Sequence, residues 1–558
     1  MRFLPVNIDA FLIELDDLEQ TVALFESLTT RPIHGVTELV PAAMTILLVY
    51  RPSAVSAESI IAAIRARNLT STLADDSTLI EIPVRYGGED LIEVARLLGI
   101  SEAELVRRHT AGNYRVAFTG FAPGFAYLTG GHPSLDVSRR STPRTRIPAG
   151  AVGLAGTFSG IYPRESPGGW QIIGTTDLPM WDLAREVPAL LQPGDRVRFV
   201  DVAGTTVRGT YATVPHGSVP PAHVVRPERL VDAAGTPSRG TDSHPAIEVR
   251  AVGAQTLLED LGRPGRASLG VSPSGALDRA SLREANRLVG NASDTAGLEV
   301  VDGGLRVISR GENVLAVTGA VPALTVTSEA GRSRRQSGYQ AFALSDGDEL
   351  VLGVPSRGIR SYVAIRGGFA IEPVLGSLST DVLSGLGPPP ITPGAVLPVR
   401  PIHTGMDAIS LNSSAPDELP GIETVTLDLV LGPRTDWFTA EAVSALGQQV
   451  WTVTPQSNRV GLRLRGDVSL NRTITDELPS EGTVAGALQV PPDGQPVLFL
   501  ADHPLTGGYP VIGAVAGYQL NLVGQIPVGG TIRFNPISEF GDLANRESSS
   551  VHTSIEEN

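Results

Sequence analysis

The sequence contains no cysteine and no lysine, so all 44 of its Lys/Arg residues are arginine. The missing cysteine excludes disulfides, thiolate nucleophiles and cysteine-ligated zinc or iron–sulfur sites. The missing lysine excludes a P-loop, a Schiff base and a Ser-x-x-Lys nucleophile. Arginine does not replace lysine as a base, because its guanidinium stays protonated. Biotin attaches to proteins through lysine, so we expect no covalent biotin on this chain.

Long hydrophobic runs and a positive net charge are also missing. No uncharged apolar run approaches the roughly 20 residues of a membrane-spanning helix. The first residues reach an acid at Asp9 without the basic and then apolar pattern of a signal peptide. A net charge of −15 argues against a nucleic-acid coat, which needs a basic face. We therefore expect a cytoplasmic protein that binds neither nucleic acid nor a membrane.

The first part of the chain has the pattern of a small α+β domain, which we place at residues 1–80. Asp16 and Ser56 are predicted N-caps, because each precedes a run whose apolar residues recur at helical spacing. The strands that we expect in this domain are 11–15, 45–50 and 79–84.

Glycine, proline and short β-branched runs dominate the next part of the chain. A helix over 90–98 is followed by a capping box, in which Ser101 pairs with Glu104. From residue 114 to about 212 the pattern is all β with tight turns. We place a β-barrel domain at 81–212.

A stretch rich in Pro, Ser, Gly and His at 213–246 is typical of a linker. A second β-rich part follows at 247–537, with one clear helix from Asp278 to Val289. The residues 538–558 form a polar tail. The fold class that we predict is therefore mostly β with an α+β N-terminal part.

Three landmarks of the first half recur in the same order in the second half. GGWQIIG (168–174) is matched by GGYPVIG (507–513), IPAGAV (147–152) by LPSEGTV (478–484), and PGDRVRF (193–199) by VGGTIRF (528–534). A looser third copy of the last landmark is DGDELVL (346–352). A glycine pair before an aromatic residue is often only a turn, but the shared order predicts repeated barrels, one in the first half and two in the second. Such barrels could face a shared cleft, where glycines leave backbone N–H groups open to an anion.

Longer motifs carry a family resemblance. FTGFAPGFAYL (118–128), PRTRIPAGAVGLAG (143–156) and GIYPRESPGGWQIIG (160–174) resemble the KipI family, also called allophanate hydrolase subunit 1. DLGRPGRASLGVSPSGALDRASLREANRLVGN (260–291), STDVLSGLG (379–387), QSNRVGLRL (456–464), SEGTVAGALQVPPDGQPV (480–497) and ADHPLTGGYP (501–510) resemble the KipA family, subunit 2. The resemblance covers nearly the whole chain.

This resemblance implies a cyclophilin-like barrel in the first half and paired cyclophilin-like barrels in the second. It also implies a fusion of the B and C parts of ATP-dependent 5-oxoprolinase, which hydrolyses 5-oxo-L-proline to L-glutamate with a separate A-type protein of the LamB/YcsF kind. Two alternatives stay open. One is the carboxyltransferase component of a urea carboxylase or urea amidolyase, which receives carboxybiotin from elsewhere. The other is a regulatory module, because KipI is associated with inhibition of a histidine kinase.

The activation of an amide for hydrolysis requires that the reactants be held in position and that the negative charge on the phosphoryl group be neutralised. Phosphorylation of an amide oxygen by ATP requires arginine, carboxylates for Mg²⁺ and backbone donors. ATP and Mg²⁺ are implied by the resemblance, since the sequence has no nucleotide motif. One departure is Val511, because members of the family commonly have lysine after GGYP. The family also leaves homo-oligomerisation open.

The candidate site residues lie in these motifs. Arg144 and Arg146 are two apart on a predicted strand and could clamp an anion or simply face solvent. We expect Arg459 and Glu481 to act together on ATP–Mg²⁺ and the substrate oxygen beside the Gly507–Gly508 backbone. The predicted catalytic residues are Arg459, Glu481, Asp502 and Arg144, of which Glu481 and Asp502 are the metal candidates. The predicted binding residues are Arg146, His109, Ser166, Gly168, Gly169, Asp278, Asn458, Gln489, Thr506, Gly507, Gly508 and Tyr509.

Overall fold

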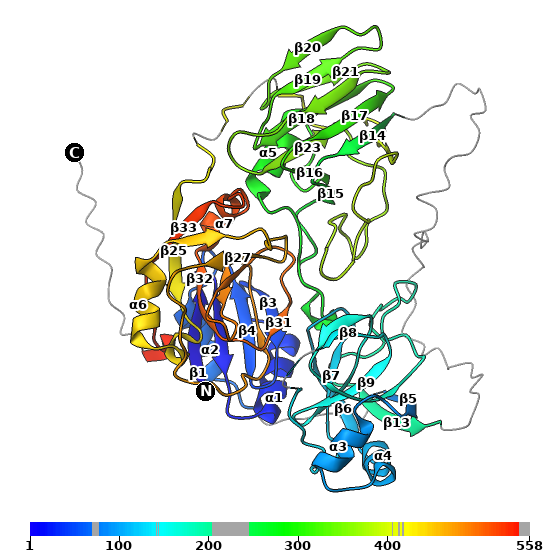
Figure 1. The fold of residues 1–558 in the computed structure, drawn as a ribbon, viewed down its shortest axis with the longest axis vertical. Coiled ribbons are helices and arrows are strands. Elements are labelled where there is room, and N and C mark those ends of the chain that lie inside the picture. The colour runs from blue at the N-terminus through cyan, green and yellow to red at the C-terminus, as the bar shows by residue number, and fades with distance from the viewer. Residues whose placement is uncertain are drawn as a thin grey trace.

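The computed structural model describes residues 1–69, 78–140, 142, 144–202, 245–403, 405–410, 413–415 and 418–545 (Figure 1). Most of the linker expected at 213–246 and most of the polar tail lie outside these residues. The described chain is mostly β, as predicted. It contains two closed seven-stranded barrels, one in each half. None of its helices is both long and apolar enough to cross a membrane.

The N-terminal unit is a four-stranded antiparallel sheet covered by two helices. Its elements are β1 (Arg2–Asn7), β2 (Ala10–Glu14), α1 (Leu18–Thr30), β3 (Val36–Pro41), β4 (Thr45–Tyr50) and α2 (Ala57–Arg65), and the strand order is β1-β2-β4-β3. Ser56 caps α2 as predicted. The cap of α1 is Asp17 and not Asp16, because the Asp17 carboxylate accepts the Gln20 N–H at 2.8 Å.

The first barrel follows. Its strands are β5 (Leu79–Tyr86), β6 (Tyr114–Thr119), β7 (Ala126–Thr129), β9 (Ala151–Ala155), β10 (Phe158–Ile161), β12 (Gln171–Thr175) and β13 (Arg196–Asp201). A separate two-stranded sheet, β8 (Arg144–Ile147) with β11 (Ser166–Gly168), lies beside it, and α3 (Leu91–Leu97) and α4 (Glu102–Thr110) precede β6. Ser101 caps α4 by accepting the Glu104 N–H at 3.2 Å, which confirms the predicted cap. The strand expected at 79–84 exists, but it belongs to this barrel.

The C-terminal barrel repeats this plan. Its strands are β25 (Thr424–Leu431), β26 (Trp451–Val453), β27 (Gly461–Arg465), β29 (Ala487–Gln489), β30 (Val497–Phe499), β32 (Val511–Val515) and β33 (Thr531–Pro536); its side sheet is β28 (Glu481–Gly482) with β31 (Thr506–Gly507). Around each ring the strands follow in one cyclic order, β5-β12-β9-β10-β7-β6-β13 and β25-β32-β29-β30-β27-β26-β33. In each barrel the first and last strands pair in parallel. The landmarks that recur in the sequence therefore belong to equivalent strands.

Two face-to-face sheets form a middle unit, which lies between the two barrels in the sequence. One sheet has the order β20-β19-β22-β17-β14-β24 and the other β15-β16-β23-β18-β21. The strands are β14 (Ala246–Val252), β15 (Gln255–Glu259), β16 (Gly297–Val301), β17 (Leu305–Arg310), β18 (Asn313–Gly319), β19 (Leu324–Thr327), β20 (Ser333–Gln336), β21 (Ala341–Leu344), β22 (Glu349–Leu352), β23 (Arg360–Ile365) and β24 (Val396–Pro398). The pair of barrels expected in 247–537 is thus one closed barrel and one unit of two sheets around a single core.

The remaining helices are short. They are η2 (Ala267–Leu269), α5 (Arg279–Val289), η3 (Thr435–Trp437), α6 (Ala440–Gln448), η4 (Gly517–Gln519), α7 (Leu520–Val523) and η5 (Leu543–Asn545). Helix α5 agrees with the predicted one: Asp278 caps its start, and Gly290, in the left-handed conformation, ends it.

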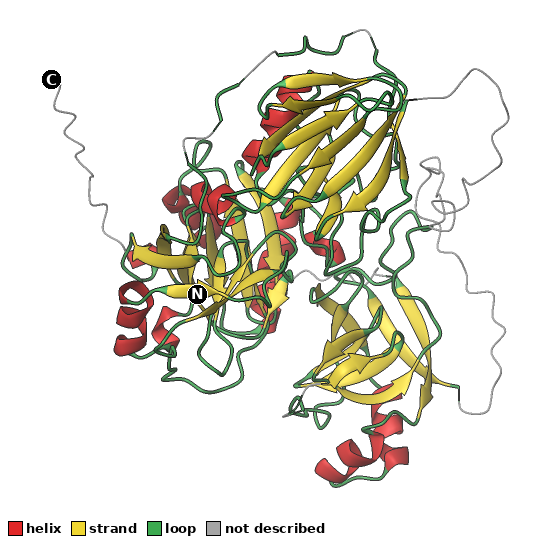
Figure 2. Ribbon diagram, turned by 45° about the horizontal axis from the view of Figure 1, so that its top comes forward, coloured by secondary structure: helices red, strands yellow, loops and turns green. Residues whose placement is uncertain are grey.

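The N-terminal sheet packs on the C-terminal barrel, so the two ends of the described chain meet (Figures 1 and 2). Asn7 donates a hydrogen bond to the Val515 carbonyl at 3.0 Å across this contact. Side chains on β2 and β4 alternate: Phe11 contributes to the core under the helices, and Leu12 and Leu47 to a core shared with Leu505. Because both faces of the sheet are covered, its strands are apolar at nearly every position.

Candidate active site

A small cavity lies where the first barrel, the middle unit and the C-terminal barrel meet. Its lining comes from residues 121–123, Arg164, Gly270 and Ser272, residues 383–384 and residues 503–505. We call it the junction cavity. Each stretch of its lining lies within one of the motifs that carry the family resemblance. Five motifs that are far apart in the sequence therefore build one site.

A tight turn at 119–123 brings the first barrel to this junction. The Phe121 N–H donates to the Thr506 hydroxyl at 3.0 Å, and the Thr119 hydroxyl donates to the Ser268 carbonyl at 2.9 Å. A Cβ on Gly120 would lie 2.6 Å from the Thr506 oxygen, so only glycine fits there. Phe121 itself has φ +66°, a conformation that costs free energy in a non-glycine residue and is found at binding sites.

Arg164 supplies positive charge to the cavity. Its guanidinium donates to the Leu383 carbonyl, and burial lowers its pKa. Among the described residues no carboxylate lies within ion-pair distance of Arg164, although the charge of the nearby Asp381 raises its pKa, and its buried Nε has no hydrogen-bond partner. Arginine stays charged under such conditions. The side chain is therefore a cation with donors to spare at the edge of a cavity.

His503 supplies an imidazole. Its Nδ1 lies 2.9 Å from the Pro504 carbonyl and 3.2 Å from the Thr483 hydroxyl, and its ring stacks on Phe499. Burial lowers the pKa of His503 below its usual value, and the nearby Asp502 only partly offsets this. The imidazole is therefore neutral at pH 7.

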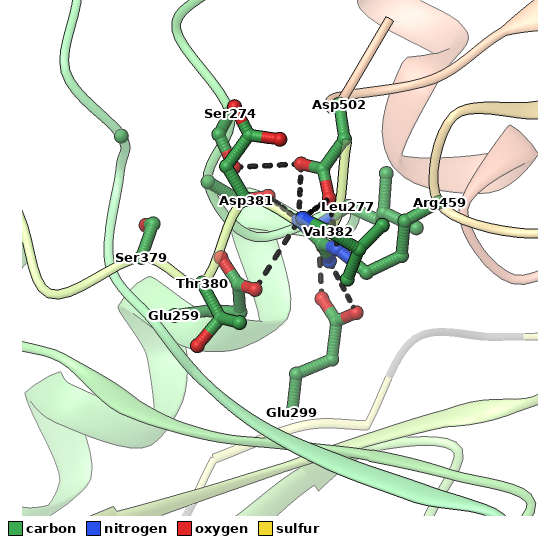
Figure 3. Close-up of polar contacts among 12 residues, drawn as sticks. Glu259, Ser274, Leu277, Glu299, Ser379, Thr380, Asp381, Val382, Arg459 and Asp502 are labelled. Carbon is green, nitrogen blue, oxygen red and sulfur yellow. Dashed lines mark hydrogen bonds and ion pairs between the residues drawn. The ribbon is translucent and has the colours of Figure 1, made fainter. Parts of the chain in front are cut away.

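A buried charge network surrounds Arg459 and includes Asp502, the residue before His503 (Figure 3). Arg459 is 1% exposed and its guanidinium donates to both oxygens of Asp502 at 3.0 Å, to Glu299 at 2.6 Å and to the Gly275 carbonyl at 2.7 Å. Asp502 also accepts from the Ser274 hydroxyl at 2.6 Å. Because Asp502 immediately precedes His503, the network fixes the position of the cavity wall.

The carboxylates around Arg459 differ in their hydrogen bonding. Glu299 accepts from Arg459, the Leu277 N–H and the Tyr362 hydroxyl. Burial alone would raise the pKa of Glu299, but Arg459 and these donors lower it. Glu259 forms an ion pair with Arg459 at 3.3 Å, yet neither of its oxygens accepts a hydrogen bond from the described residues. Burial therefore raises the pKa of Glu259 well above its usual value.

The structure brings Arg459 and Asp502 together but places Glu481 in a different network. Glu481 accepts from Arg434 Nε at 3.0 Å, and Arg434 also binds Glu14 of the N-terminal sheet at 2.6 Å. Arg459 and Glu481 therefore have different partners, and their joint contact with one ligand stays a prediction. The side chains of Arg459, Asp502 and Glu481 are all buried, and each forms an ion pair with another residue of the chain.

The described residues do not fit the expected magnesium site. No group of three or more His, Asp or Glu side chains in that part of the chain could hold a metal ion. The carboxylates of Glu481 and Asp502 are each neutralised by an arginine. They are unavailable as ligands unless those ion pairs break.

Arg144 and Arg146 do not form an anion clamp. Arg144 donates to both oxygens of Asp90 at 2.7 and 2.8 Å and pairs with Glu89 at 3.1 Å. Arg146 is 76% exposed and pairs with Glu165 at 2.6 Å. Both guanidinium groups already have carboxylate partners, and of the two only Arg146 faces solvent as the alternative expected.

His109 is a core residue and not a ligand-binding one. Its Nδ1 lies 2.7 Å from the Tyr86 hydroxyl and its Nε2 2.9 Å from the Ser159 hydroxyl. The ring stacks on Phe199 and is completely buried. Burial lowers its pKa to about 3, so it carries no charge that the α4 dipole could favour.

The two glycine pairs are required by side chains of the protein itself. A Cβ on Gly168 would collide with the Tyr162 hydroxyl, and one on Gly507 with the Gln489 amide. A Cβ on Gly508 would lie 3.0 Å from a guanidinium nitrogen of Arg139. Side chains therefore fill the position that a Cβ would take at each of these glycines. Gly507 nevertheless lines a second small cavity together with Glu481, Thr483 and Tyr509, so the anion cradle expected there stays a prediction. Gly169 uses its carbonyl to accept the Arg140 N–H at 2.8 Å.

The other predicted binding residues have structural partners. Asn458 forms a turn by accepting the Val460 N–H at 2.9 Å, and Asp278 caps α5 and accepts from Gln525 at 2.8 Å. Ser166 lies on β11, outside the lining of the junction cavity. Tyr509 is 42% exposed, and Arg472 lies over its ring. Of the predicted binding residues, Thr506 is the one that contacts a turn of the junction cavity.

Arg164, His503 and Ser384 line the cavity, and the sequence patterns did not single them out. Each lies in a motif of the family resemblance: PRESPGG, ADHPLTGG and STDVLSGLG. The available signal was a charged or titratable residue next to a proline or glycine turn.

Comparison with known proteins gives the family. Family models of the carboxyltransferase domain match residues 1–191 (subdomains C and D) and 269–536 (subdomains A and B). The C component of the 5-oxoprolinase of Escherichia coli K12 is 34% identical over 294 residues, which cover 52% of this chain and 90% of that protein. The chain belongs to the carboxyltransferase-domain family, as a fused KipI/KipA-type protein. Its first half is 43% identical to the B component of the 5-oxoprolinase of Escherichia coli O157:H7 over 170 residues, which cover 30% of this chain and 78% of that protein.

Two further relatives give the range of the family. The crystal structure of TTHA0988 has a TM-score of 0.76 and 32% identity, and the match covers 94% of this chain and 99% of that one. The single-chain arrangement of both halves thus has a solved counterpart with the same fold. The urea amidolyase of Lachancea kluyveri is 30% identical over 318 residues, which cover 52% of this chain but only 17% of that protein.

Proposed function

We propose that this protein is a fused B–C component of ATP-dependent 5-oxoprolinase and that the junction cavity, which has room for about one water molecule in this structure, opens to bind the lactam. It would act with an A-type partner of the LamB/YcsF kind to convert 5-oxo-L-proline to L-glutamate. The observation that supports this most directly is that motifs from both halves line one cavity. Relatives of the two halves are the B and C components of that enzyme.

The charge in the cavity favours a substrate with a carboxylate. Arg164 is a cation without an ion-pair partner among the described residues, and 5-oxoproline is an anion. Urea, the substrate of the alternative carboxyltransferase reaction, is neutral. A charge-assisted bond from a planar guanidinium to a carboxylate is among the stronger polar contacts in proteins. Arg164 would therefore bind the carboxylate and orient the ring.

The remaining lining segments shape the cavity around the lactam. The turn at 383–384 and the 503–505 segment of the C-terminal barrel both line it, and the N–H groups and the Ser384 hydroxyl of that turn donate to Asp381. Arg459 and Asp502 act as positioning residues, because they hold the 503–505 segment. ATP would supply the phosphoryl group. Mg²⁺ would be held by phosphate oxygens and water, as is usual for nucleotide complexes.

The test is 5-oxoproline-dependent ATP hydrolysis by this chain together with an A-type partner. Turnover with 5-oxo-L-proline and little or none with 2-pyrrolidone, which lacks the carboxylate, is the expected result. Arg164→Met should raise KM by about 10- to 100-fold, since a hydrogen bond to a charged group contributes about 1.5–3 kcal/mol. Arg146→Met is the matched control and should leave KM unchanged.

Three results would contradict the proposed function or the role of Arg164. No 5-oxoproline-dependent turnover with a partner that is active with its own B and C components would contradict the proposed function. Carboxylation of urea with a biotinylated partner protein would move the chain to the urea carboxylase reaction. Normal KM for Arg164→Met would remove Arg164 from the site while leaving the function standing.

A further inference from the structure

The hydrogen bonds of His503 determine which of its ring nitrogens carries the proton. Nδ1 lies 2.9 Å from the Pro504 carbonyl oxygen, which can only accept. The second neighbour of Nδ1 is the Thr483 hydroxyl at 3.2 Å, and that hydroxyl donates its own proton to the same carbonyl. Both neighbours of Nδ1 therefore act as acceptors. In a neutral imidazole one nitrogen donates and the other accepts, so Nδ1 carries the hydrogen.

The other nitrogen, Nε2, is left with a free lone pair. It has no hydrogen-bond partner among the described residues, yet it is not sealed away in the interior. His503 lines the junction cavity, and we infer that Nε2 faces it. The ring cannot turn away easily, since it stacks on Phe499 at 5.8 Å and is held at Nδ1.

We propose that His503 is the general base of the reaction in the junction cavity, with Nε2 accepting the N–H proton of the substrate. This inference rests on the proposed function, because it assigns the base for the lactam bound by Arg164. Arg164 comes from the first barrel and His503 from the C-terminal barrel, so each half contributes one reacting or binding group.

Proton and phosphoryl transfer are coupled in this step. His503 Nε2 takes the proton from the lactam nitrogen as the lactam oxygen forms a bond to the γ-phosphorus of ATP. The bond between that phosphorus and ADP breaks, and ADP leaves with its electron pair. The products are ADP, an O-phosphorylated cyclic imidate and an imidazolium. Water then adds across the C=N bond, and the imidazolium protonates the nitrogen as the ring C–N bond breaks, which leaves an acyl phosphate for a second water to hydrolyse.

Physical properties of the site fit this role. A base must be neutral before the reaction, and burial lowers the pKa of His503 and so keeps it uncharged. The imidazolium that forms is stabilised through Nδ1–H by the Pro504 carbonyl and by the nearby Asp502 carboxylate. Asp502 is itself fixed by two hydrogen bonds from Arg459, so it acts on the ring through its charge. The ring is thus held in place through Nδ1, and Nε2 is the nitrogen that accepts the proton.

The first test uses the chain alone. Nitrogen-15 NMR of the imidazoles should show His503 in the Nδ1–H tautomer, and adding 5-oxo-L-proline should shift the Nε2 resonance more than the Nδ1 resonance. His503→Asn identifies the signal by its loss. The Nε2–H tautomer, or an Nε2 resonance that 5-oxo-L-proline does not move, would overturn the proposal.

The second test uses the complete enzyme with its A-type partner. His503→Asn keeps an N–H for the Pro504 carbonyl but removes the base, so kcat should fall by about 10²- to 10⁴-fold with KM little changed. The matched control is His132→Asn at an exposed loop position, which should keep full activity. If folded His503→Asn retains kcat within about threefold, less than general-base catalysis contributes, His503 is not the base. If the unmodified complex shows no 5-oxoproline-dependent turnover, the proposed function fails on its own, while the NMR result still decides whether Nε2 contacts the ligand.

Discussion

The backbone N–H of Phe121 donates to the hydroxyl of Thr506 at 3.0 Å and so joins the first barrel to the second. The contact lies between the turn at the junction cavity and the strand that begins the repeated glycine motif. Glycine at position 120 permits this close approach, because a Cβ there would collide with the Thr506 hydroxyl. The geometry of the cavity thus depends in part on this contact between the two halves.

Thr506→Val should weaken this interface. The change keeps the shape of the side chain but leaves the Phe121 N–H without its acceptor, which costs about 1–3 kcal/mol when the donor is buried. The free energy of unfolding, measured by chemical denaturation, should fall by that amount. Thr37→Val at an exposed position is the control and should change it by less than about 0.5 kcal/mol. Equal values for both variants would mean that the Phe121–Thr506 bond contributes nothing.

Glu259 and Glu299 should respond differently to loss of charge. Glu259→Gln should be tolerated, because burial raises the pKa of Glu259 and already favours its neutral form. Glu299→Gln should destabilise the protein by about 3–5 kcal/mol, since it removes a charged partner of buried Arg459. Denaturation curves of both variants at pH 7 measure the difference. A larger loss for Glu259→Gln would show that the ionised form of Glu259 is needed.

The same pair should have opposite pH dependence. The folded-state pKa of Glu259 is raised, so its contribution to stability is present at low pH and lost as the pH rises. The folded-state pKa of Glu299 is lowered, so its contribution is present above its unfolded pKa and lost as the pH falls. The stability of Glu259→Gln relative to the unmodified chain, followed by denaturation at several pH values, should therefore rise as the pH increases above the ordinary glutamate value of 4.5.

His109 should make the protein sensitive to mild acid. Its folded-state pKa is about 3, well below the ordinary value of 6.5, because the ring is buried. As the pH falls below about 6.5, the unfolded chain gains a proton at His109 that the folded chain does not, and stability falls by up to about 1.4 kcal/mol per pH unit. His109→Gln should flatten this slope between about pH 6.5 and pH 4 in denaturation experiments. His132→Gln, at an exposed position, should not.

A double-mutant cycle tests why position 168 is glycine. Gly168→Ala should cost about 1–3 kcal/mol, because the added methyl group collides with the Tyr162 hydroxyl. Tyr162→Phe removes that hydroxyl and should restore most of the loss in the double variant, although it carries a smaller cost alone. Additive losses would show that another atom sets the limit.

Local features of the fold could be predicted from the sequence. The caps Ser56, Ser101 and Asp278 were readable because each cap involves only the next few residues. The order of the repeated landmarks predicted equivalent strands in the two barrels. Asp17, which caps α1 in place of Asp16, shows the usual error of one residue at a helix start.

The candidate site was harder to predict because its partners are distant in the sequence. Nothing near Arg459 in the sequence indicates that Glu299 neutralises it, and nothing near Gly507 indicates that Gln489 fills the adjacent space. Sequence motifs marked the right segments, but they did not show which side chains face a cavity and which face a buried partner. Arg164 and His503 became visible only when the two halves were placed together.

The packing of the N-terminal sheet on the C-terminal barrel also sets the timing of folding during synthesis. The face of the sheet that carries Leu12 and Leu47 is covered by residues that include Leu505 and Phe540, which are synthesised much later. At about 5–20 residues per second, the ribosome needs on the order of half a minute or more to make the roughly 500 residues between them. During this interval the sheet presents an uncovered apolar surface, which makes the nascent chain a candidate for chaperone binding.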